Sequence, residues 1–440
     1  MELSVFGELL SNGNGIVDLM NDLGEAVALR PDMLTLGGGN PAAIPEIQAL
    51  WRDYARRFLC DSDSFDKALA CYDSPQGDPR FLDAFASLFR ERFGVPITSK
   101  NVVAVSGAQQ GAFLLFNMIA GGTRDGKRKK ILTPLSPEYV GYAGLGVDSN
   151  LFISCPGKIT YPDENDASVF KYEVDFNAVE RALQDDDVSA ILVSRPTNPS
   201  GNMISRAELQ RLDRLAEKYN ALLIIDSAYG GPFPGIVEDE SELDSVFWTP
   251  RTALFYSLSK IGLPGLRTAF LIASEEIVER IATMNAIVAL TNNSIGQRIA
   301  LPMFESGDVL RVSREIVRPY YCKRRAEAIE ILQGELSRVG VDARLHKSEG
   351  AFFLWLWIPG LTSGSANLYN QLKAKGVLAI PGDGFFYGLG DDHMNEEFSA
   401  SRARCMRISF SSSYEIVARG LRIIAETIRD CVDADSASGR

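Results

Sequence analysis

The stretch TALFYSLSKIGLPGLRTAFLIA, residues 252–273, has an apolar run at each end and a polar loop between them. The runs Thr252–Ser257 and Ala269–Ala273 predict two short buried strands. Lys260 comes directly after the first run, where a solvated surface charge is poorly placed, and a lysine amine can form a Schiff base with a carbonyl group. An ordinary surface loop is the alternative interpretation. The nearby side chains suited to a phosphate group are Ser257, Ser259 and Arg267.

Similar apolar runs occur upstream and alternate with helical patterns such as Ala207–Tyr219. This alternation predicts an α/β domain with a mostly parallel, seven-stranded sheet between helices. In parallel sheets, binding and catalytic sites lie at the carboxyl ends of the strands. The residues that follow each apolar run are therefore the candidate site residues. The five further strands are expected at Val102–Val105, Lys130–Thr133, Leu151–Ser154, Ala190–Ser194 and Ala221–Asp226.

The pattern changes after about residue 305 and predicts a smaller α+β domain. A helical stretch, Val309–Leu336, contains Pro319, which can kink it, and a final helix begins with the capping-box pattern Ser412–Glu415. We expect a large domain over residues 66–305 and a small domain formed by residues 1–65 with 306–440. The polar tail Asp433–Arg440 is expected to fray. The strands of the small domain are expected at Ala343–His346, Phe352–Trp357 and Met406–Phe410.

Three more polar segments follow predicted strands. Gly107, Ala108 and Gln109 open a helix, and free backbone N–H groups at a helix N-terminus can bind phosphate. Asn198 lies between two prolines in the segment 194–202, SRPTNPSGN. Asp226 ends a buried strand, where a carboxylate needs a cationic or hydrogen-bonding partner. The residues alone leave open a plain turn at the first two segments and a helix N-cap at Asp226.

Composition excludes several classes of function. The 440-residue chain has 57 acidic and 45 basic residues, and its net charge of −12 argues against nucleic acid and anionic membranes as partners. The densest apolar run, Ala351–Ile358, is too short to span a bilayer. Six scattered cysteines and the lack of a signal peptide predict a cytoplasmic protein. The two histidines, His346 and His393, suggest neither a catalytic triad nor a metal site, so the reactivity of an enzyme with this sequence is expected to come from elsewhere, such as a cofactor.

Pyridoxal phosphate is the cofactor that this combination of residues suits. It needs a Schiff-base lysine, an acid against its pyridinium nitrogen and anchors for its phosphate. The chain resembles the fold-type I, class I/II pyridoxal-phosphate aminotransferases over nearly its whole length. More closely, it resembles the valine–pyruvate aminotransferase subfamily in six segments: LGGGNPA (36–42), YDSPQG (72–77), SRPTNPSGN (194–202), IDSAYGGPFPGI (225–236), SLSKIGLPGLR (257–267) and EGAFFLWLW (349–357).

The resemblance implies a role for each matching residue. Lys260 would hold the cofactor and then move a proton between the substrate Cα and the cofactor C4′. Asp226 would keep the pyridine nitrogen protonated, and Tyr139 would stack on the ring. Asn198 and Tyr229 would hydrogen-bond the phenolic oxygen of the ring. The phosphate would be held by the backbone at Gly107, Ala108 and Gln109, the hydroxyls of Ser257 and Ser259, and Arg267.

The same resemblance implies the substrates. Arg407 matches the arginine that binds the substrate α-carboxylate, a group that a guanidinium binds bidentately, and Asn198 and the backbone at Gly39 would complete that site. The implied reaction converts L-valine and pyruvate to 3-methyl-2-oxobutanoate and L-alanine with ping-pong kinetics. Tyr72 matches a tyrosine that reaches a phosphate in the neighbouring subunit, which implies a homodimer with shared active sites.

One further inference concerns the substrate side chain. Relatives that act on dicarboxylates carry a second arginine in the region matching Met284–Gln297, which contains no basic residue here. A small apolar side chain therefore fits better than aspartate, although Arg298 follows at once.

Other functions stay open at this point. The same fold and cofactor support β-lyases, decarboxylases and cyclopropane-forming synthases, and an aminotransferase of a specialised pathway would use another donor or acceptor. A transcriptional regulator would need a DNA-binding module before the first motif, and that motif begins at residue 36. The acidic stretch Gly388–Ser401 is either part of the substrate entrance or an idle surface loop.

Overall fold

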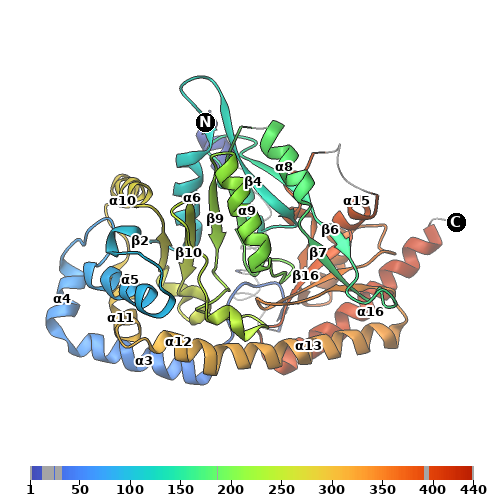
Figure 1. Ribbon diagram of the computed structural model, residues 1–440. Coiled ribbons are helices and arrows are strands. Elements are labelled where there is room, and N and C mark those ends of the chain that lie inside the picture. Colours follow the sequence, from blue (N-terminus) through green and yellow to red (C-terminus); the bar gives the residue numbers. More distant parts are fainter. Residues whose placement is uncertain (1, 12–23, 25–31, 186, 391–395, 439–440) are drawn as a thin grey trace.

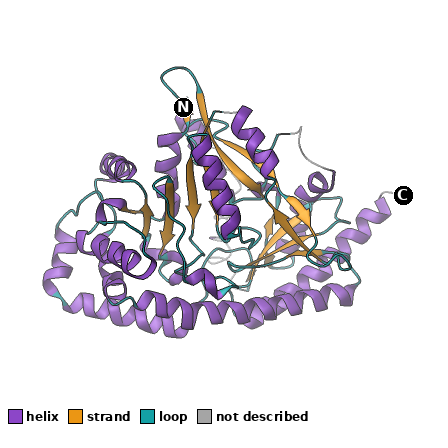
Figure 2. Ribbon diagram, in the orientation of Figure 1, coloured by secondary structure: helices purple, strands orange, loops and turns teal. Residues whose placement is uncertain are grey.

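The computed structural model describes residues 2–11, 24, 32–185, 187–390 and 396–438. Two sheets lie side by side, and a long row of helices that includes α3, α12 and α13 runs along the bottom of the view in Figure 1. Helices surround the sheets, as Figure 2 shows by colour. The helices are α1 (Val5–Ser11), α3 (Pro45–Cys60), α4 (Ser62–Ala70), α5 (Pro79–Phe93), α6 (Ala108–Ile119), α7 (Val140–Ala143), α8 (Phe176–Asp185), α9 (Arg206–Lys218), α10 (Glu275–Ala289), α11 (Ser294–Glu305), α12 (Asp308–Val312), α13 (Arg318–Val339), α14 (Ser365–Ala374), α15 (Glu396–Arg402) and α16 (Tyr414–Ser438).

The larger sheet confirms the predicted α/β architecture. Its strand order is β2-β11-β10-β9-β8-β4, with β3 and β5 both paired to β4. All seven expected strands are present, and the two-residue β3 is an addition. Most pairs are parallel, whereas β11 is antiparallel to both of its neighbours. The strands are β2 (Val102–Val105), β3 (Gly121–Gly122), β4 (Arg128–Ser136), β5 (Phe152–Pro156), β8 (Val188–Ser194), β9 (Leu222–Asp226), β10 (Thr252–Ser257) and β11 (Ala269–Ile272).

Both faces of this sheet are buried, which explains why its strands are continuous apolar runs. Along β9, Leu223 and Ile225 belong to one apolar core and Ile224 belongs to a second. Residues from α5 and α9 contribute to the first core, and residues from α6 and α10 contribute to the second. Strand register aligns Ser194 with Asp226 and Asp226 with Phe255, so the carboxyl ends of β8, β9 and β10 lie next to one another.

A second sheet, of six strands, has the order β15-β16-β13-β12-β7-β6. The three strands expected after residue 305 are in it. Residues 158–173, which lie inside the range expected for the large domain, contribute β6 and β7 to this sheet, and β7 pairs with β12 in parallel. The strands are β6 (Lys158–Thr160), β7 (Val169–Glu173), β12 (Arg344–His346), β13 (Phe353–Trp357), β15 (Ile380–Pro381) and β16 (Cys405–Ser409). A separate parallel pair joins β1 (Leu34–Thr35) to β14 (Val377–Leu378).

Three local expectations are modified by the structure. The helical stretch 309–336 is interrupted by a π-helical turn, Ser313–Val317, and Pro319 is the second residue of α13, directly after that turn. The final helix is capped one residue later than expected, because the Ser413 hydroxyl accepts from the Ile416 backbone N–H at 3.4 Å. The tail is helical as far as Ser438, and its last two residues lie outside the described residues.

The N-terminal segment packs onto both sheets. Trp51 on α3 donates a hydrogen bond from Nε1 to the Ile261 carbonyl oxygen at 2.8 Å, beside β10. Leu36 bridges to the smaller sheet, since its carbonyl oxygen accepts from the Ser409 N–H at 2.6 Å. The described helices include none that is long and apolar enough to cross a membrane. The described residues also contain no cluster of three or more potential metal ligands.

Candidate active site

Lys260 lies in a one-turn helix, Ser259–Ile261, directly after β10. Its Nζ donates to the Gly39 carbonyl oxygen at 2.6 Å and lies 5.3 Å from the centre of the Tyr229 ring. Burial lowers the pKa of the Lys260 amine to about 8, and the neighbouring Arg407 and Arg267 contribute to the decrease. About a tenth of the amine is therefore neutral and nucleophilic at pH 7, far more than for a solvated lysine.

Asp226 ends β9 and is buried among neutral donors. The Tyr142 hydroxyl donates to Oδ2, and the Ala228 N–H donates to Oδ1 at 2.9 Å. Burial raises the pKa of the Asp226 carboxyl, whereas the Tyr142 hydrogen bond and the Lys260 charge act in the opposite direction. A cation placed against this carboxylate would replace lost solvation and stabilise its charged form.

The N-terminus of α6 has no side-chain cap and lies against Arg267. Gly107 precedes the helix with φ of 85°. A Cβ atom at Gly107 would lie 2.0 Å from Arg267 Nη2, so only glycine allows this arginine to approach the turn. Arg267 Nη1 donates to Ser259 Oγ at 3.4 Å, and Ser257 Oγ accepts from the Ser259 N–H at 3.1 Å. Free N–H groups, hydroxyls and a guanidinium together suit a phosphate.

Two aromatic side chains lie between these groups. Tyr139 follows β4, and its ring is 5.0 Å from that of Tyr142 in an edge-to-face arrangement. Burial raises the pKa of the Tyr139 hydroxyl, and the charges of Arg407, Asp226 and Arg267 act on it, which places the ring among the site residues. Gln109 Nε2 donates to the Gly141 carbonyl oxygen at 2.8 Å and so joins the start of α6 to α7.

Arg407 on β16 is 2% exposed and faces the same site. Nη1 donates to Asn198 Oδ1 and Nη2 to the Gly37 carbonyl oxygen, both at 2.7 Å. The guanidinium lies 4.2 Å from the centre of the Phe353 ring, and its buried Nε has no hydrogen-bond partner among the described residues. Burial lowers the pKa of Arg407 to about 10, so it stays charged at neutral pH. Such a cation suits a carboxylate ligand.

Residues 36–42 contact two of the cations in the site, Lys260 and Arg407. The Gly37 and Gly39 carbonyl oxygens accept from Arg407 and Lys260. The Ala42 N–H donates to the Tyr321 hydroxyl at 2.8 Å, which ties the segment to α13.

Known proteins of similar sequence identify the family. A family model for aminotransferase class I and II matches residues 51–422. The valine–pyruvate aminotransferase of Escherichia coli (strain K12) is 40% identical over 431 residues, which cover 97% of this chain and 98% of that protein. The chain belongs to the class I and II aminotransferase family.

Solved structures of the family have the same fold. A putative amino-acid aminotransferase from Psychrobacter arcticum 273-4 matches with a TM-score of 0.92 and 35% identity, covering 98% of this chain and 99% of that one. The valine–pyruvate aminotransferase from Salmonella typhimurium LT2 matches with a TM-score of 0.81 and 38% identity, covering 95% of this chain and 99% of that one. Fold type I, predicted from the motifs, is therefore confirmed for this aminotransferase.

Most of the residues singled out in the sequence lie together in this site. Tyr72 is the exception: it is 80% exposed and takes part in none of the contacts described above. Of the two histidines, His346 is buried in β12, where its Nε2 accepts from the Tyr172 N–H at 3.1 Å. Burial lowers the pKa of His346 to about 3, so this histidine is neutral. His393 lies outside the described residues, as does part of the acidic stretch 388–401.

The structure adds residues that the sequence did not indicate. Tyr142, three positions after Tyr139 on a short helix, is the hydrogen-bond partner of Asp226. Tyr321 accepts a hydrogen bond from Ala42 in the 36–42 segment, although the two residues are 279 positions apart in the chain. Glu138 is bonded to Ser194 at the end of β8. A helical spacing of three could have associated Tyr142 with Tyr139, whereas the other two contacts depend on tertiary packing.

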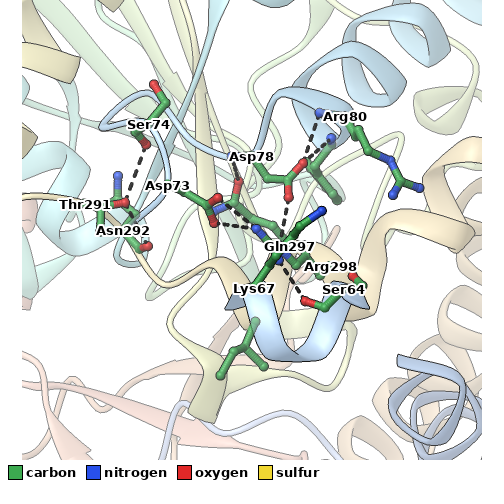
Figure 3. A network of polar contacts seen from close by, with 12 residues as sticks. Ser64, Lys67, Asp73, Ser74, Asp78, Arg80, Thr291, Asn292, Gln297 and Arg298 are labelled. Atoms are coloured by element: carbon green, nitrogen blue, oxygen red, sulfur yellow. Dashed lines mark hydrogen bonds and ion pairs between the residues drawn. The ribbon is translucent and has the colours of Figure 1, made fainter. Parts of the chain in front are cut away.

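Arg298 belongs to a different polar network, shown in Figure 3. Its Nη2 donates to both carboxylate oxygens of Asp73 at 2.8 and 3.0 Å, and its Nε donates to Asp78 Oδ2 at 3.0 Å. Nη1 donates to the Ser64 carbonyl oxygen at 2.9 Å. Through its bonds to Asp73 and Asp78, Arg298 anchors the segment that follows Tyr72.

Proposed function

We propose that this chain is a pyridoxal-phosphate-dependent aminotransferase that transfers the amino group between L-valine, or another small apolar amino acid, and pyruvate. The products would be 3-methyl-2-oxobutanoate and L-alanine. The observation that carries the proposal is the convergence of Lys260, Asp226 and Arg407 in one buried site. The E. coli relative named above supports the choice of substrates.

The chain's own residues fit pyridoxal phosphate. The family depends on this cofactor, which when bound supplies the electron sink for bond cleavage at the substrate Cα. The uncapped start of α6, Ser257, Ser259 and Arg267 would hold its phosphate, with Gly107 allowing the close approach of Arg267. Asp226, kept in place by Tyr142, would hold the protonated ring nitrogen. Tyr139 would stack on the ring, and Asn198 and Tyr229 would face its phenolic oxygen.

Lys260 would carry the proton in this reaction. Its lowered pKa favours the neutral amine, which would take a proton from the substrate Cα and deliver it to the cofactor C4′. Arg407, with Asn198 and the backbone at Gly39, would bind the α-carboxylate and so fix the Cα proton near Nζ. Alternating donor and acceptor at one site gives ping-pong kinetics.

The substrate side chain is proposed to be small and apolar. Residues 284–297 contain no basic residue, and the arginine that follows is paired with Asp73 and Asp78. Arg298 is therefore engaged within its own network, which supports an apolar side-chain site over one for a second carboxylate.

A homodimer with shared sites is also proposed. Tyr72 at 80% exposure, Ile287 at 80%, Val288 at 61% and Leu290 at 60% leave large apolar side chains uncovered. The Thr291 hydroxyl donates to the Ser74 carbonyl oxygen at 3.5 Å, which links the two exposed segments. A second copy covering them would bring Tyr72 toward its phosphate. We expect dimers by light scattering, with Ile287→Ser weakening dimerisation.

The organisation and location follow the same proposal. Residues 66–305 would form the large cofactor-binding domain, with 158–173 paired to the smaller sheet, and residues 1–65 with 306–440 would form the small domain. All six cysteines are unpaired, which supports a reducing cytoplasmic location.

The decisive experiment separates the two half-reactions. The cofactor-loaded enzyme is treated with L-valine, freed of products and then given pyruvate. We expect 3-methyl-2-oxobutanoate in the first step, and L-alanine with the original visible absorbance in the second. Failure of alanine to appear would show that the chemistry is not transamination with pyruvate. A panel of amino donors and 2-oxo acceptors then distinguishes valine from the substrate of a specialised pathway.

A further inference from the structure

A buried carboxylate, Glu138, lies beside the proposed cofactor site and has no part in the function described above. It follows β4, and it is 3% exposed. Its Oε1 accepts hydrogen bonds from the Tyr139 N–H at 2.7 Å and from the Ser194 hydroxyl, and its Oε2 accepts from the Ser194 N–H at 3.0 Å. All three donors are neutral groups.

A carboxylate in such a place is costly to ionise. Burial raises the pKa of Glu138 to about 7, and the charge of Asp226 acts in the same direction, whereas the hydrogen bonds from Ser194 and Tyr139 oppose it. Within the described chain no lysine or arginine forms an ion pair with it. The three hydrogen bonds stabilise the charged form, and a nearby cationic ring would stabilise it further.

The hydrogen-bond partners of Glu138 are Ser194, which leads to Asn198, and Tyr139. Asn198 and Tyr139 are both proposed to contact the cofactor. Ser194 ends β8 directly opposite Asp226 in the sheet, and the chain continues from it to Asn198. Thr197 Oγ1 donates to the Ser194 carbonyl oxygen at 3.0 Å, which fixes the turn between them. On the other side, Tyr139 packs against Tyr142, the donor to Asp226. One carboxylate therefore joins the backbone of the stacking tyrosine to the strand end that presents Asn198.

From these contacts we infer that Glu138 is a positioning residue of the transamination site. Its carboxyl group holds the backbone of Tyr139 and the Ser194 strand end that leads to Asn198, and in its ionised form its charge, next to that of Asp226, favours the protonated ring. It acts through these residues and contacts no reacting atom. The inference rests on the proposed function, because it requires the cofactor to lie against Tyr139 and Asp226.

The test compares three variants in binding of pyridoxal phosphate to the full chain, with no amino acid added. Glu138→Gln keeps the size of the side chain but removes the charge and turns an NH₂ group toward one of the N–H donors. Ser194→Ala removes one hydroxyl donor and keeps the carboxyl group, whose charged form loses one of its three hydrogen bonds. Leu332→Ala, a fully buried position on α13, is the control for lost stability. Each is measured for cofactor affinity, for the pH midpoint of the cofactor's visible absorbance and for melting temperature.

For Glu138→Gln we expect about a tenfold loss of cofactor affinity, as for one charge-assisted hydrogen bond. The absorbance midpoint should move to lower pH, because an anion near protonated nitrogen atoms has been removed. Ser194→Ala should lose affinity by a smaller factor and shift its midpoint less, because it weakens the charged form of Glu138 without removing the carboxyl group. Leu332→Ala should lower the melting temperature and change neither cofactor property.

Wild-type affinity and midpoint in Glu138→Gln, with a melting temperature lowered as in Leu332→Ala, would make Glu138 purely structural and overturn the inference. If Glu138→Gln does not fold, wild-type affinity in Ser194→Ala overturns it instead. A wild-type chain that binds no pyridoxal phosphate would contradict the proposed function itself, which separates the two failures.

Discussion

Two largely buried regions of this aminotransferase each contain an arginine. They differ in whether a carboxylate is paired with the guanidinium. Arg298 is paired with two carboxylates, Asp73 and Asp78, and its charge is neutralised within the network of Figure 3. Arg407 donates only to neutral oxygens of Asn198 and Gly37, and its Nε has no partner among the described residues. Lys260 likewise donates to a carbonyl oxygen.

The difference indicates what each region is built for. A buried cation that already has its anion stabilises the fold around it, since breaking such a pair leaves an uncompensated charge. A buried cation without an anion has lost solvation and has no opposite charge to replace it. An anionic ligand stabilises such a cation. The charge state of the surroundings, more than burial or residue type, separates the binding arginine from the structural one.

The largest effect is expected at Lys260. Lys260→Ala should lower turnover by about 10⁴-fold or more, because it removes the group that transfers the proton. Borohydride treatment of the cofactor-loaded variant should give no covalent label on the protein, detected by mass spectrometry. Persistent labelling would assign the lysine role to another residue.

Arg407→Ala should have the next largest effect. We expect kcat/KM for amino acids to fall about 10²- to 10³-fold, since a buried carboxylate loses its bidentate partner. Cofactor affinity, measured by absorbance titration, should stay near the wild-type value. An equal loss of cofactor and substrate binding would place Arg407 in the structural class with Arg298.

Arg298→Ala should affect stability instead. The buried Asp78 and the partly buried Asp73 would lose their partner, at a cost of about 3 kcal/mol in the free energy of unfolding measured with urea. Arg298→Ala combined with Asp73→Asn should cost less than the two single changes together. The ratio of rates with valine and aspartate should not change. A shift in that ratio would mean that Arg298 reaches the substrate.

The smallest effect is a pH dependence at Lys260. Its pKa of about 8 means that the neutral amine decreases below that pH. Capture of pyridoxal phosphate by the cofactor-free enzyme should therefore slow by about tenfold per pH unit from about pH 7 downward, and level off above about pH 9. Stopped-flow absorbance measures this. A flat profile would show that the Lys260 amine is not the titrating nucleophile.

Much of the site was predictable because its parts are local. Lys260, Asp226 and the start of α6 each follow an apolar strand, and parallel strands bring their carboxyl ends to one edge. Contacts between distant segments were not predictable. Arg407 meets Gly37 across 370 residues of chain, and residues 158–173 leave the larger sheet to pair with β12. No short-range periodicity carries that information.

The amino-acid sequence by itself determined the α/β pattern, the seven strands of the larger sheet and the order of the residues that suit pyridoxal phosphate. Apolar periodicity and strand-end chemistry are local properties, so they can be read along the chain. Tertiary structure alone decided which charges are paired: Arg298 is paired with Asp73 and Asp78, whereas Asp226 accepts from the neutral Tyr142 hydroxyl and Arg407 has no carboxylate partner among the described residues. Electrostatic pairing depends on distances of a few ångströms between segments far apart in sequence, and only the folded chain sets those distances.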